Sequence, residues 1–293
     1  MSSKYSIKDL ERLSGIKAHT LRIWEQRYNI LHPERTDTNI RFYNGNDLRK
    51  ILNISLLNNN GYKISTIAKL SGAAILTEAE KFLNNYNKES DQIDNLVICL
   101  IDVNEELFEK TINNSILKFG FENTFEKIIF PFLKHLGNMW QAGIINPAQE
   151  HYISNLIRQK LIVGIDNIKV KINEKAKSYV FFLPNQELHE MGLLYTYYLT
   201  KAKGHKCSYL GQSLPLEDLS SIVKTLKPDF LVTILTSSLP ENETSEFLRN
   251  YSEKIKEPKF LISGRLVLSE KESLQLPPKF KIFEDFEDFK KMI

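Results

Sequence analysis

The sequence predicts a multidomain protein in which two α-helical parts precede an α/β part built on a doubly wound parallel sheet. Three observations predict it. Helical periodicity with one short alternating segment occupies residues 1–75, and longer helical periodicity follows to about residue 172. In residues 173–293, apolar runs of strand length alternate with helical stretches. With 293 residues, of which 42% are hydrophobic, the chain can fill more than one core, so we expect domains at 1–75, 76–172 and 173–293.

The first part predicts two short helices joined by a tight turn. Residues 6–9 read as a capping box that opens a helix, and Gly15 follows its end. Residues 17–28 carry apolar side chains at helical spacing, which indicates a second helix with one apolar stripe. Beyond Pro33, residues 39–43 alternate between polar and apolar like a small strand. This order is typical of a winged helix-turn-helix.

The outward face of the second helix predicts contact with nucleic acid. Residues 1–50 carry ten Lys/Arg against six Asp/Glu, whereas the whole chain has a net charge of +3, so the basic excess lies in this part. Arg22 has the reach for guanine or phosphate, and its neighbours have the reach for phosphate. The residues that we expect at the DNA from this helix are His19, Thr20, Arg22, Arg27 and Tyr28.

Residues 5–70, which begin YSIKDLERLSGIKAHTLRIWEQRYNI, resemble the winged-helix DNA-binding domain of the MerR family of transcription regulators. The resemblance implies that dimers bind a double-stranded DNA operator. It also implies that the wing touches the DNA backbone through Arg35, Asn39, Arg41 and Tyr43. The long dimerisation helix of that family is not evident after Leu70, so we expect the later domains to form a homo-oligomer, either a dimer or a tetramer.

Residues 93–170 predict a four-helix bundle. The polar stretch 84–92 reads as a linker that precedes it. Apolar residues recur at helical spacing in two segments, one with Leu107, Ile112, Ile116 and Phe119, the next with Phe125, Ile128, Ile129, Phe132 and Leu136.

The last part predicts a parallel sheet whose strands end at a ligand crevice. Strands are expected at 179–183, 207–210, 230–235, 260–263 and 280–283, with helices at 188–203, 215–226 and 241–254. Ligands of such sheets bind beyond the carboxyl ends of the strands. Glu187 and His189 follow the first strand directly, and a carboxylate so close to an imidazole can hold one ring nitrogen while the other coordinates a metal.

The segment Glu187-Leu188-His189-Glu190-Met191-Gly192 resembles the D-x-H-x-x-G signature of Rossmann-like cobalamin-binding domains. The resemblance implies that His189 is the lower cobalt ligand, with Glu187 as its partner, and that Gly192 lets the cofactor approach the backbone. Residues 236–239 stand where these domains have an S-x-L loop around the nucleotide tail, and residues 263–264 where they have Gly-Gly. The residues thereby expected at the tail are Thr236, Leu239, Ser263 and Gly264. Thr for Ser and Ser for Gly are departures that bear on affinity.

Trp140 and the pair Glu150-His151 reproduce a W-x9-E-H pattern. It resembles the helical bundle that covers the upper face of adenosylcobalamin in light-sensing MerR-type repressors. The implied cofactor is therefore cobalamin, with adenosylcobalamin as the expected form, and these three residues are expected to cover it. In those relatives a histidine follows the tryptophan and captures cobalt after illumination. Here Gln141 stands at that position, so a response to light stays open.

Together these features predict a cytoplasmic transcription regulator, not an enzyme, whose oligomerisation and DNA affinity are controlled by cobalamin. One alternative is a MerR-type regulator whose degenerate, cofactor-free domain serves protein–protein interaction. The other is a cobalamin methyltransferase or mutase subunit, against which stands the lack of a nucleophile–base constellation or a separate substrate domain. The sequence has no apolar run long enough for a membrane span and no export signal, and its two cysteines suit a reducing compartment.

Overall fold

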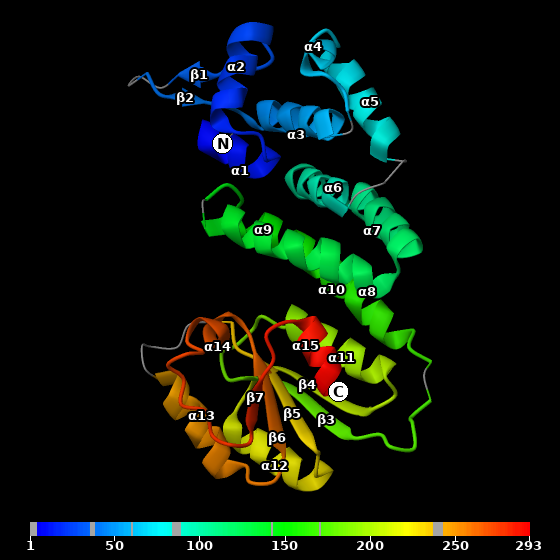
Figure 1. Ribbon diagram of the computed structural model, residues 1–293, viewed down its shortest axis with the longest axis vertical. Helices are drawn as coiled ribbons and strands as arrows, with labels where there is room; N and C mark the ends of the chain where they lie inside the picture. Colours follow the sequence, from blue (N-terminus) through cyan, green and yellow to red (C-terminus); the bar gives the residue numbers. More distant parts are fainter. Residues whose placement is uncertain are drawn as a thin grey trace. The chain divides into compact units, whose positions relative to one another are not determined.

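The chain forms two compact units in the computed structural model, Met1–Ile157 and Arg158–Ile293. The structure describes residues 5–35, 39–59, 61–83, 89–141, 143–169, 171–236 and 243–293. The predicted fold class is confirmed, because a helical first part with a small wing is followed by a parallel five-stranded sheet (Figure 1). The division into three domains at residues 75 and 172 stays a prediction.

The first unit begins with a short helix pair and a wing. Helix α1 (Ile7–Ser14) starts at the predicted capping box, in which Ser6 and Asp9 cap each other's backbone N–H, and it ends at Gly15 with φ of +70°. Helix α2 (Ala18–Tyr28) follows, and strands β1 (Glu34–Arg35) and β2 (Arg41–Phe42) pair antiparallel as the wing. Further helices are α3 (Gly45–Asn59), α4 (Ile64–Ile67) and α5 (Gly72–Leu83).

Helix α3 is the central element of the first unit. It is buried on all sides from Ile51 to Leu57 and contacts α1, α5 and α6 (Glu89–Asp102). Ser55 donates a buried hydrogen bond of 2.8 Å to the Ser14 carbonyl in the turn before α2, and Arg49 pairs with Asp102 of α6 at 2.6 Å. Because α3 touches both the helix pair and the bundle, it joins them into one unit.

The bundle consists of α6, α7 (Glu105–Phe119), a continuous segment of α8 (Phe121–Thr124), η1 (Phe125–Ile129) and α9 (Phe130–Gln141), and α10 (Pro147–Asp166). The η1 segment is a π-helical turn. We attribute it to Pro131, which lacks an N–H and whose ring crowds the carbonyl of Lys127 in a regular α-helix. The predicted apolar face from Phe125 to Leu136 is buried as expected.

Two predictions for the bundle are wrong in part. Residues 89–92 of the predicted linker belong to α6, where Gln92 is completely buried, whereas residues 84–88 lie outside the described residues. In α7 the buried face holds Thr111 and Ser115 beside Phe108 and Ile112, not the predicted apolar stripe. Polar side chains face inward here because Ser115 donates its hydroxyl proton to the Thr111 carbonyl at 2.8 Å, and the Gln92 side-chain oxygen lies 3.3 Å from the same hydroxyl.

The second unit is a doubly wound sheet with the strand order β4-β3-β5-β6-β7, all parallel (Figure 1). The strands are β3 (Ser178–Pro184), β4 (Lys206–Leu214), β5 (Phe230–Ile234), β6 (Lys259–Ser263) and β7 (Phe280–Ile282). The helices are α11 (Met191–Ala202), α12 (Leu216–Leu226), α13 (Glu243–Lys254) and two that sequence patterns missed, α14 (Arg265–Ser269) and α15 (Phe286–Met292).

This strand order places a switch point between β3 and β5, where the chain reverses its direction of travel across the sheet. Side chains of α12 and α13 pack with those of the strands in one core, including Leu219, Val223 and Leu248. On the other face, Tyr197 of α11 meets the ring of Phe181 edge-on. Helices therefore cover both faces, and the carboxyl ends of the strands form the exposed edge at which a ligand can bind.

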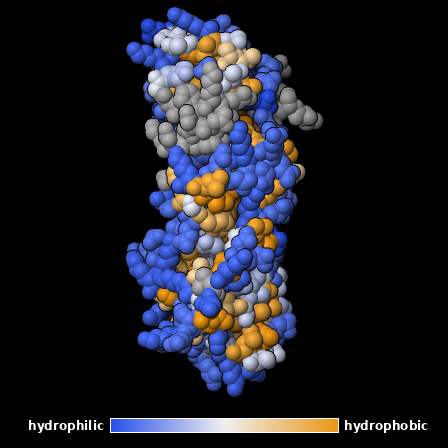
Figure 2. Space-filling model, turned by 90° about the vertical axis from the view of Figure 1, so that its right-hand side faces the viewer, coloured by the Kyte–Doolittle hydropathy of each residue, from blue (hydrophilic) through white to orange (hydrophobic). Residues whose placement is uncertain are grey.

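The surface drawn in Figure 2 is mostly hydrophilic and is interrupted by separate hydrophobic patches. Among the described residues, no helix has the length and apolar character required to cross a membrane.

Gly264 is the backbone position in the second unit that tolerates a side chain least. Its φ is +107°, and a Cβ placed there would lie 2.3 Å from the Leu235 carbonyl oxygen. We expect Gly264→Ala to lower the free energy of unfolding by roughly 2–4 kcal/mol, measured by urea denaturation followed by circular dichroism. The control is Gly137→Ala in α9, where the added methyl meets no atom within 4 Å and helix propensity rises by about 1 kcal/mol. Equal losses in the two variants would refute this.

Asp94 should make the first unit less stable as the pH rises. Burial, with a smaller contribution from Asp91, raises the pKa of the Asp94 carboxyl to about 7 from 3.8. The folded protein then keeps a proton that the unfolded chain has lost, so stability falls as pH rises between these values and stays low above them. Asp94→Asn should therefore add on the order of 2–4 kcal/mol to the unfolding free energy at pH 8 relative to its effect at pH 4. Asp166→Asn, which makes the same substitution at an exposed position, is the control in the same denaturation series.

Candidate functional site

Helix α2 is held in a fixed position by the helix before it. The Glu11 carboxylate of α1 accepts the Ala18 N–H at 3.0 Å and the Lys17 ammonium at 3.1 Å. These hydrogen bonds, that of Lys17 first, lower the pKa of Glu11. A carboxylate at the first turn of α2 also matches the positive end of the helix dipole. Glu11 therefore acts as the cap that Lys17, at the N-cap position, does not supply.

The outward face of α2 carries most of the predicted DNA contacts. His19, Arg22 and Arg27 are exposed, whereas Thr20 and Tyr28 are half-buried. The Arg27 guanidinium lies over the Tyr28 ring at 5.6 Å from its centroid. The Leu21 and Trp24 side chains lie in the core, as the stripe predicted. The helix thus presents cations on one side while its apolar side is anchored.

The wing is tied to α2 by Glu25, a residue that the sequence did not single out. Its carboxylate accepts Arg41 at 3.3 Å through one oxygen and the Tyr43 hydroxyl at 3.0 Å through the other. Burial, followed by the bond to Glu25, raises the pKa of Tyr43. Tyr43 is completely buried, which corrects its expected place at the DNA backbone: its side chain joins the wing to α2 instead. No local pattern in the sequence marks Glu25.

The other wing residues lie on the surface. Arg35 donates to the Asn39 side chain across the tip of the wing, and both side chains are exposed. Asn39 has φ of +64°, a conformation that asparagine tolerates better than most residues. Arg41 is half-buried because its guanidinium forms an ion pair with Glu25. Of the four predicted wing contacts, three therefore keep side chains that reach solvent.

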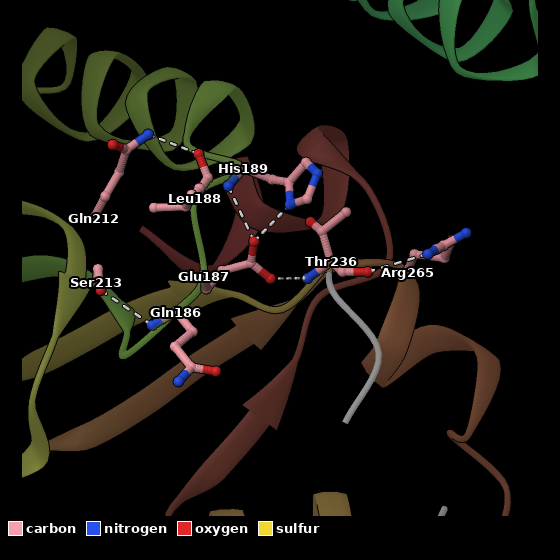
Figure 3. Close-up of polar contacts among 8 residues, drawn as sticks. All are labelled: Gln186, Glu187, Leu188, His189, Gln212, Ser213, Thr236 and Arg265. Carbon is pink, nitrogen blue, oxygen red and sulfur yellow. Dashed lines mark hydrogen bonds and ion pairs between the residues drawn. The ribbon is translucent and has the colours of Figure 1, made fainter. Parts of the chain in front are cut away.

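Glu187 and His189 form the centre of the site in the second unit (Figure 3). Glu187 follows β3 and is buried, with one oxygen accepting the His189 backbone N–H at 3.0 Å and its ring Nδ1 at 2.7 Å. The other oxygen accepts the Thr236 N–H at the end of β5, at 2.8 Å. The His189 side chain remains 63% exposed. Since Nδ1 faces the carboxylate, Nε2 lies on the far side of the ring, where a metal ligand is needed.

The backbone around His189 is fixed from both sides. Gln212 of β4 donates to the Leu188 carbonyl at 2.6 Å, and the Glu190 N–H donates to the same carbonyl at 2.9 Å. Gln186, with φ of +67°, donates its N–H to the Ser213 hydroxyl at 3.1 Å. Figure 3 shows these contacts converging on the turn between β3 and α11. The histidine therefore stands on a turn with little freedom to move.

Gly192 and Gly264, two glycines of the predicted site, are needed for the packing of the second unit itself. A Cβ on Gly192 would lie 2.9 Å from Ile234 of β5, so this glycine lets α11 approach the sheet. Gly264 is required by its φ and by the Leu235 carbonyl, independently of any ligand. Ser263 is buried at the end of β6, and its carbonyl accepts the Leu235 N–H at 2.8 Å. Leu239 lies outside the described residues.

The three predicted cap residues belong to the bundle. Trp140, near the end of α9, is 54% exposed, which is unusual for so large an apolar side chain. Glu150 and His151 lie in the first turns of α10, where the His151 ring contacts Glu150 at 2.7 Å and Ser154 donates to the same carboxylate at 2.7 Å. Trp140 and His151 therefore offer an aromatic surface and a polar ring at the bundle surface. Nothing is described of the Gln141 side chain.

The donor set in the second unit fits the cobalt of a cobalamin. A metal that is held inside a macrocycle needs one axial donor from the protein, and His189 supplies an exposed imidazole whose tautomer is set by a buried carboxylate. The site also lies at the switch point between β3 and β5, the usual ligand position in this class of sheet.

Comparisons with known proteins show similarity in both helical parts and along most of the chain. Residues 5–73 match the model of the MerR HTH family regulatory protein, and residues 92–163 match that of a B12 binding domain. The chain is similar to the HTH-type transcriptional repressor CarH of Myxococcus xanthus, with 25% identity over 82% of each chain. It is also similar to the repressor CarA of that organism, with 24% identity over 82% of this chain and 79% of CarA.

A solved structure supports the fold of the later parts. The monomethylamine corrinoid protein of Methanosarcina barkeri aligns with a TM-score of 0.57 and 16% identity, covering 70% of this chain and 98% of that one. At that identity the likeness concerns the fold alone. Together the two family models and the similarity to CarH and CarA indicate that the chain joins a MerR-type HTH domain to a B12 binding domain.

Proposed function

We propose that the protein binds a double-stranded DNA operator through α2 and the wing, and that cobalamin controls this binding by changing how protomers associate. The observation that carries the proposal is the Glu187–His189 pair at the switch point of the sheet, with both carboxylate oxygens engaged. The names of the relatives CarH and CarA, both transcriptional repressors, support a regulatory and not a catalytic role in the cytoplasm.

In the proposed cofactor site, His189 is the lower axial ligand and Glu187 keeps its Nε2 basic and aimed away from the turn. Trp140, Glu150 and His151 cover the upper face, for which adenosylcobalamin is the expected form. Thr236, Leu239, Ser263 and Gly264 border the nucleotide tail, and Gly192 brings α11 close to the sheet. When bound, the cofactor would supply a cobalt ion, for which His189 would be the protein ligand.

Control of DNA binding requires that cobalamin bind one assembly more tightly than the other. A dimer or tetramer that presents several copies of α2 engages tandem half-sites with an avidity far above that of one protomer. Light scattering after size exclusion, with and without cobalamin, tests this step directly. If the mass of the assembly is the same with and without cobalamin, the cofactor does not change protomer association and the proposed control of DNA affinity is wrong.

A cofactor-free interaction module is the second candidate. The buried Ser263 side chain favours it, because it stands where the resemblance calls for glycine beside the nucleotide tail. The two candidates separate in one experiment, in which purified protein is mixed with adenosylcobalamin in the dark, desalted and then illuminated. Retained cofactor supports the sensor, and a spectral change on illumination reveals photochemistry despite Gln141. Complete loss of cofactor supports the interaction module.

Arg22→Ala should weaken specific operator binding by roughly 1–3 kcal/mol, because Arg22 is an exposed cation on the outward face of α2. The measurement is a fluorescence anisotropy titration at physiological salt, with a scrambled duplex as reference. Arg249→Ala, which removes the same charge from an exposed position of α13, is the control and should bind like the wild type. If both variants bind alike, Arg22 is a solvated surface residue.

His189→Ala should abolish histidine coordination of cobalamin without unfolding the protein, since the side chain is largely exposed. The absorption spectrum of the bound cofactor reports the loss of the axial nitrogen, and circular dichroism reports the fold. His32→Ala, at an exposed position of the first unit, removes a histidine without touching the site. A coordinated spectrum that survives in His189→Ala would assign the ligand elsewhere.

A further inference from the structure

Glu190 stands at the N-cap position of α11, yet its carboxylate makes no capping bond to that helix. The short side chains of Asp, Asn, Ser and Thr are the ones that cap their own helix at this position, and the longer glutamate side chain reaches elsewhere. Here the side chain is buried, with 7% exposure, and its two oxygens bind partners from two other elements. The Glu190 carboxylate therefore connects the start of α11 to two other elements.

The partners of Glu190 come from α10 and β4. One oxygen binds the Arg158 guanidinium of α10, and the other accepts the Tyr209 hydroxyl of β4 at 2.7 Å. Burial, followed by the bond to Glu190, raises the pKa of Tyr209, so its hydroxyl remains a donor at any physiological pH. Burying a carboxylate costs several kcal/mol unless it is paired and hydrogen-bonded, and this one is both.

Glu190 directly follows His189, so a fixed Glu190 fixes the turn that carries the histidine. The Glu190 N–H donates to the Leu188 carbonyl, which also accepts Gln212, and the His189 N–H donates to Glu187. Each residue from Leu188 to Glu190 is thereby held at its backbone. Glu190 is the member of this stretch whose side chain reaches α10.

Helix α10 also carries Glu150 and His151, which the proposed function assigns to the upper face of the cofactor. The same helix therefore carries Glu150 and His151 near its start and, further along, Arg158, which binds Glu190, the residue next to His189. Loss of the Arg158 cation would leave the buried Glu190 carboxylate with the Tyr209 hydroxyl as its remaining side-chain partner among the described residues.

We propose that Glu190, held by Tyr209 and Arg158, is a positioning residue that aligns His189 for cobalt and links this alignment to helix α10. The inference rests on the proposed cobalamin function. It differs from it in concerning three residues that no sequence motif marked, and it assigns a route by which events at α10 reach the axial ligand.

The test compares four variants with the wild type. Tyr209→Phe and Glu190→Gln each weaken the link without removing bulk, and Arg158→Met removes the cation while it keeps most of the aliphatic stem. The matched control is Lys254→Met, which breaks an ion pair with Glu217 at 2.7 Å elsewhere in the second unit. Each protein is loaded with adenosylcobalamin in the dark and titrated with acid, and the absorption spectrum gives the midpoint at which the imidazole leaves cobalt.

We expect the three link variants to lose about tenfold in the coordination equilibrium, the lower range for residues that orient a metal ligand, and thus to release at a pH about one unit higher. Lys254→Met should titrate like the wild type. Wild-type midpoints in all three variants, together with lower stability in urea, would overturn the proposal and leave Glu190 a packing residue.

A second measurement needs no cofactor. In the protein without cobalamin, exchange of the His189 amide should be at least tenfold faster in Tyr209→Phe than in the wild type, while amides in β5 keep their rates. Unchanged exchange would overturn the link even if cobalamin never binds. If His189 of the wild type does not coordinate cobalamin, but the amide exchange rates of wild type and Tyr209→Phe differ as expected, the proposed cobalamin function is wrong. The positioning of His189 by Glu190 and Tyr209 is then still supported.

Discussion

The second unit depends on the placement of one buried carboxylate. Glu187 binds the imidazole and the backbone of His189 through one oxygen and the end of β5 through the other. Without these donors a charge in this position would be expelled or protonated. The three bonds therefore fix the two strand ends that flank the switch point, and the fold and the chemistry of the site are maintained by the same contacts.

In the first unit a comparable constraint is the burial of α3. A helix that is buried on all sides over about two turns must be enclosed, and the elements that contact α3 include α1 of the helix pair and α6 of the bundle. The bond from Ser55 to the turn before α2 and the pair between Arg49 and Asp102 add direction to this packing. A change in the bundle at α6 thus meets the core of the DNA-binding part without an intervening flexible segment.

Sequence patterns predicted the elements that are determined by residues close to one another in the sequence. Apolar runs located all five strands, and the capping box located α1, because strand burial and helix caps are decided within a few residues. The roles of Glu25, Tyr43 and Glu190 could not be predicted, because their hydrogen-bond partners lie many residues away in the sequence. Such long-range hydrogen bonds produce no regular residue spacing that a sequence pattern could reveal. Gln92 was misassigned to a linker because the sequence of a polar side chain that is buried in a core looks like that of one in solvent. For the candidate site, the family signature located His189 and Glu187, but not the link to α10.

The bonds from Glu25 to Arg41 and Tyr43 turn α2 and the wing into a single rigid reading surface. Such a surface cannot follow the local shape of each duplex it meets, so the duplex has to bend or twist to fit it. Deformation energy depends on base steps that the protein never touches. Under the proposed function, operator choice should therefore include the stiffness of the DNA, and two operators with identical contacted bases would differ in affinity according to the flexibility of the base steps between those bases.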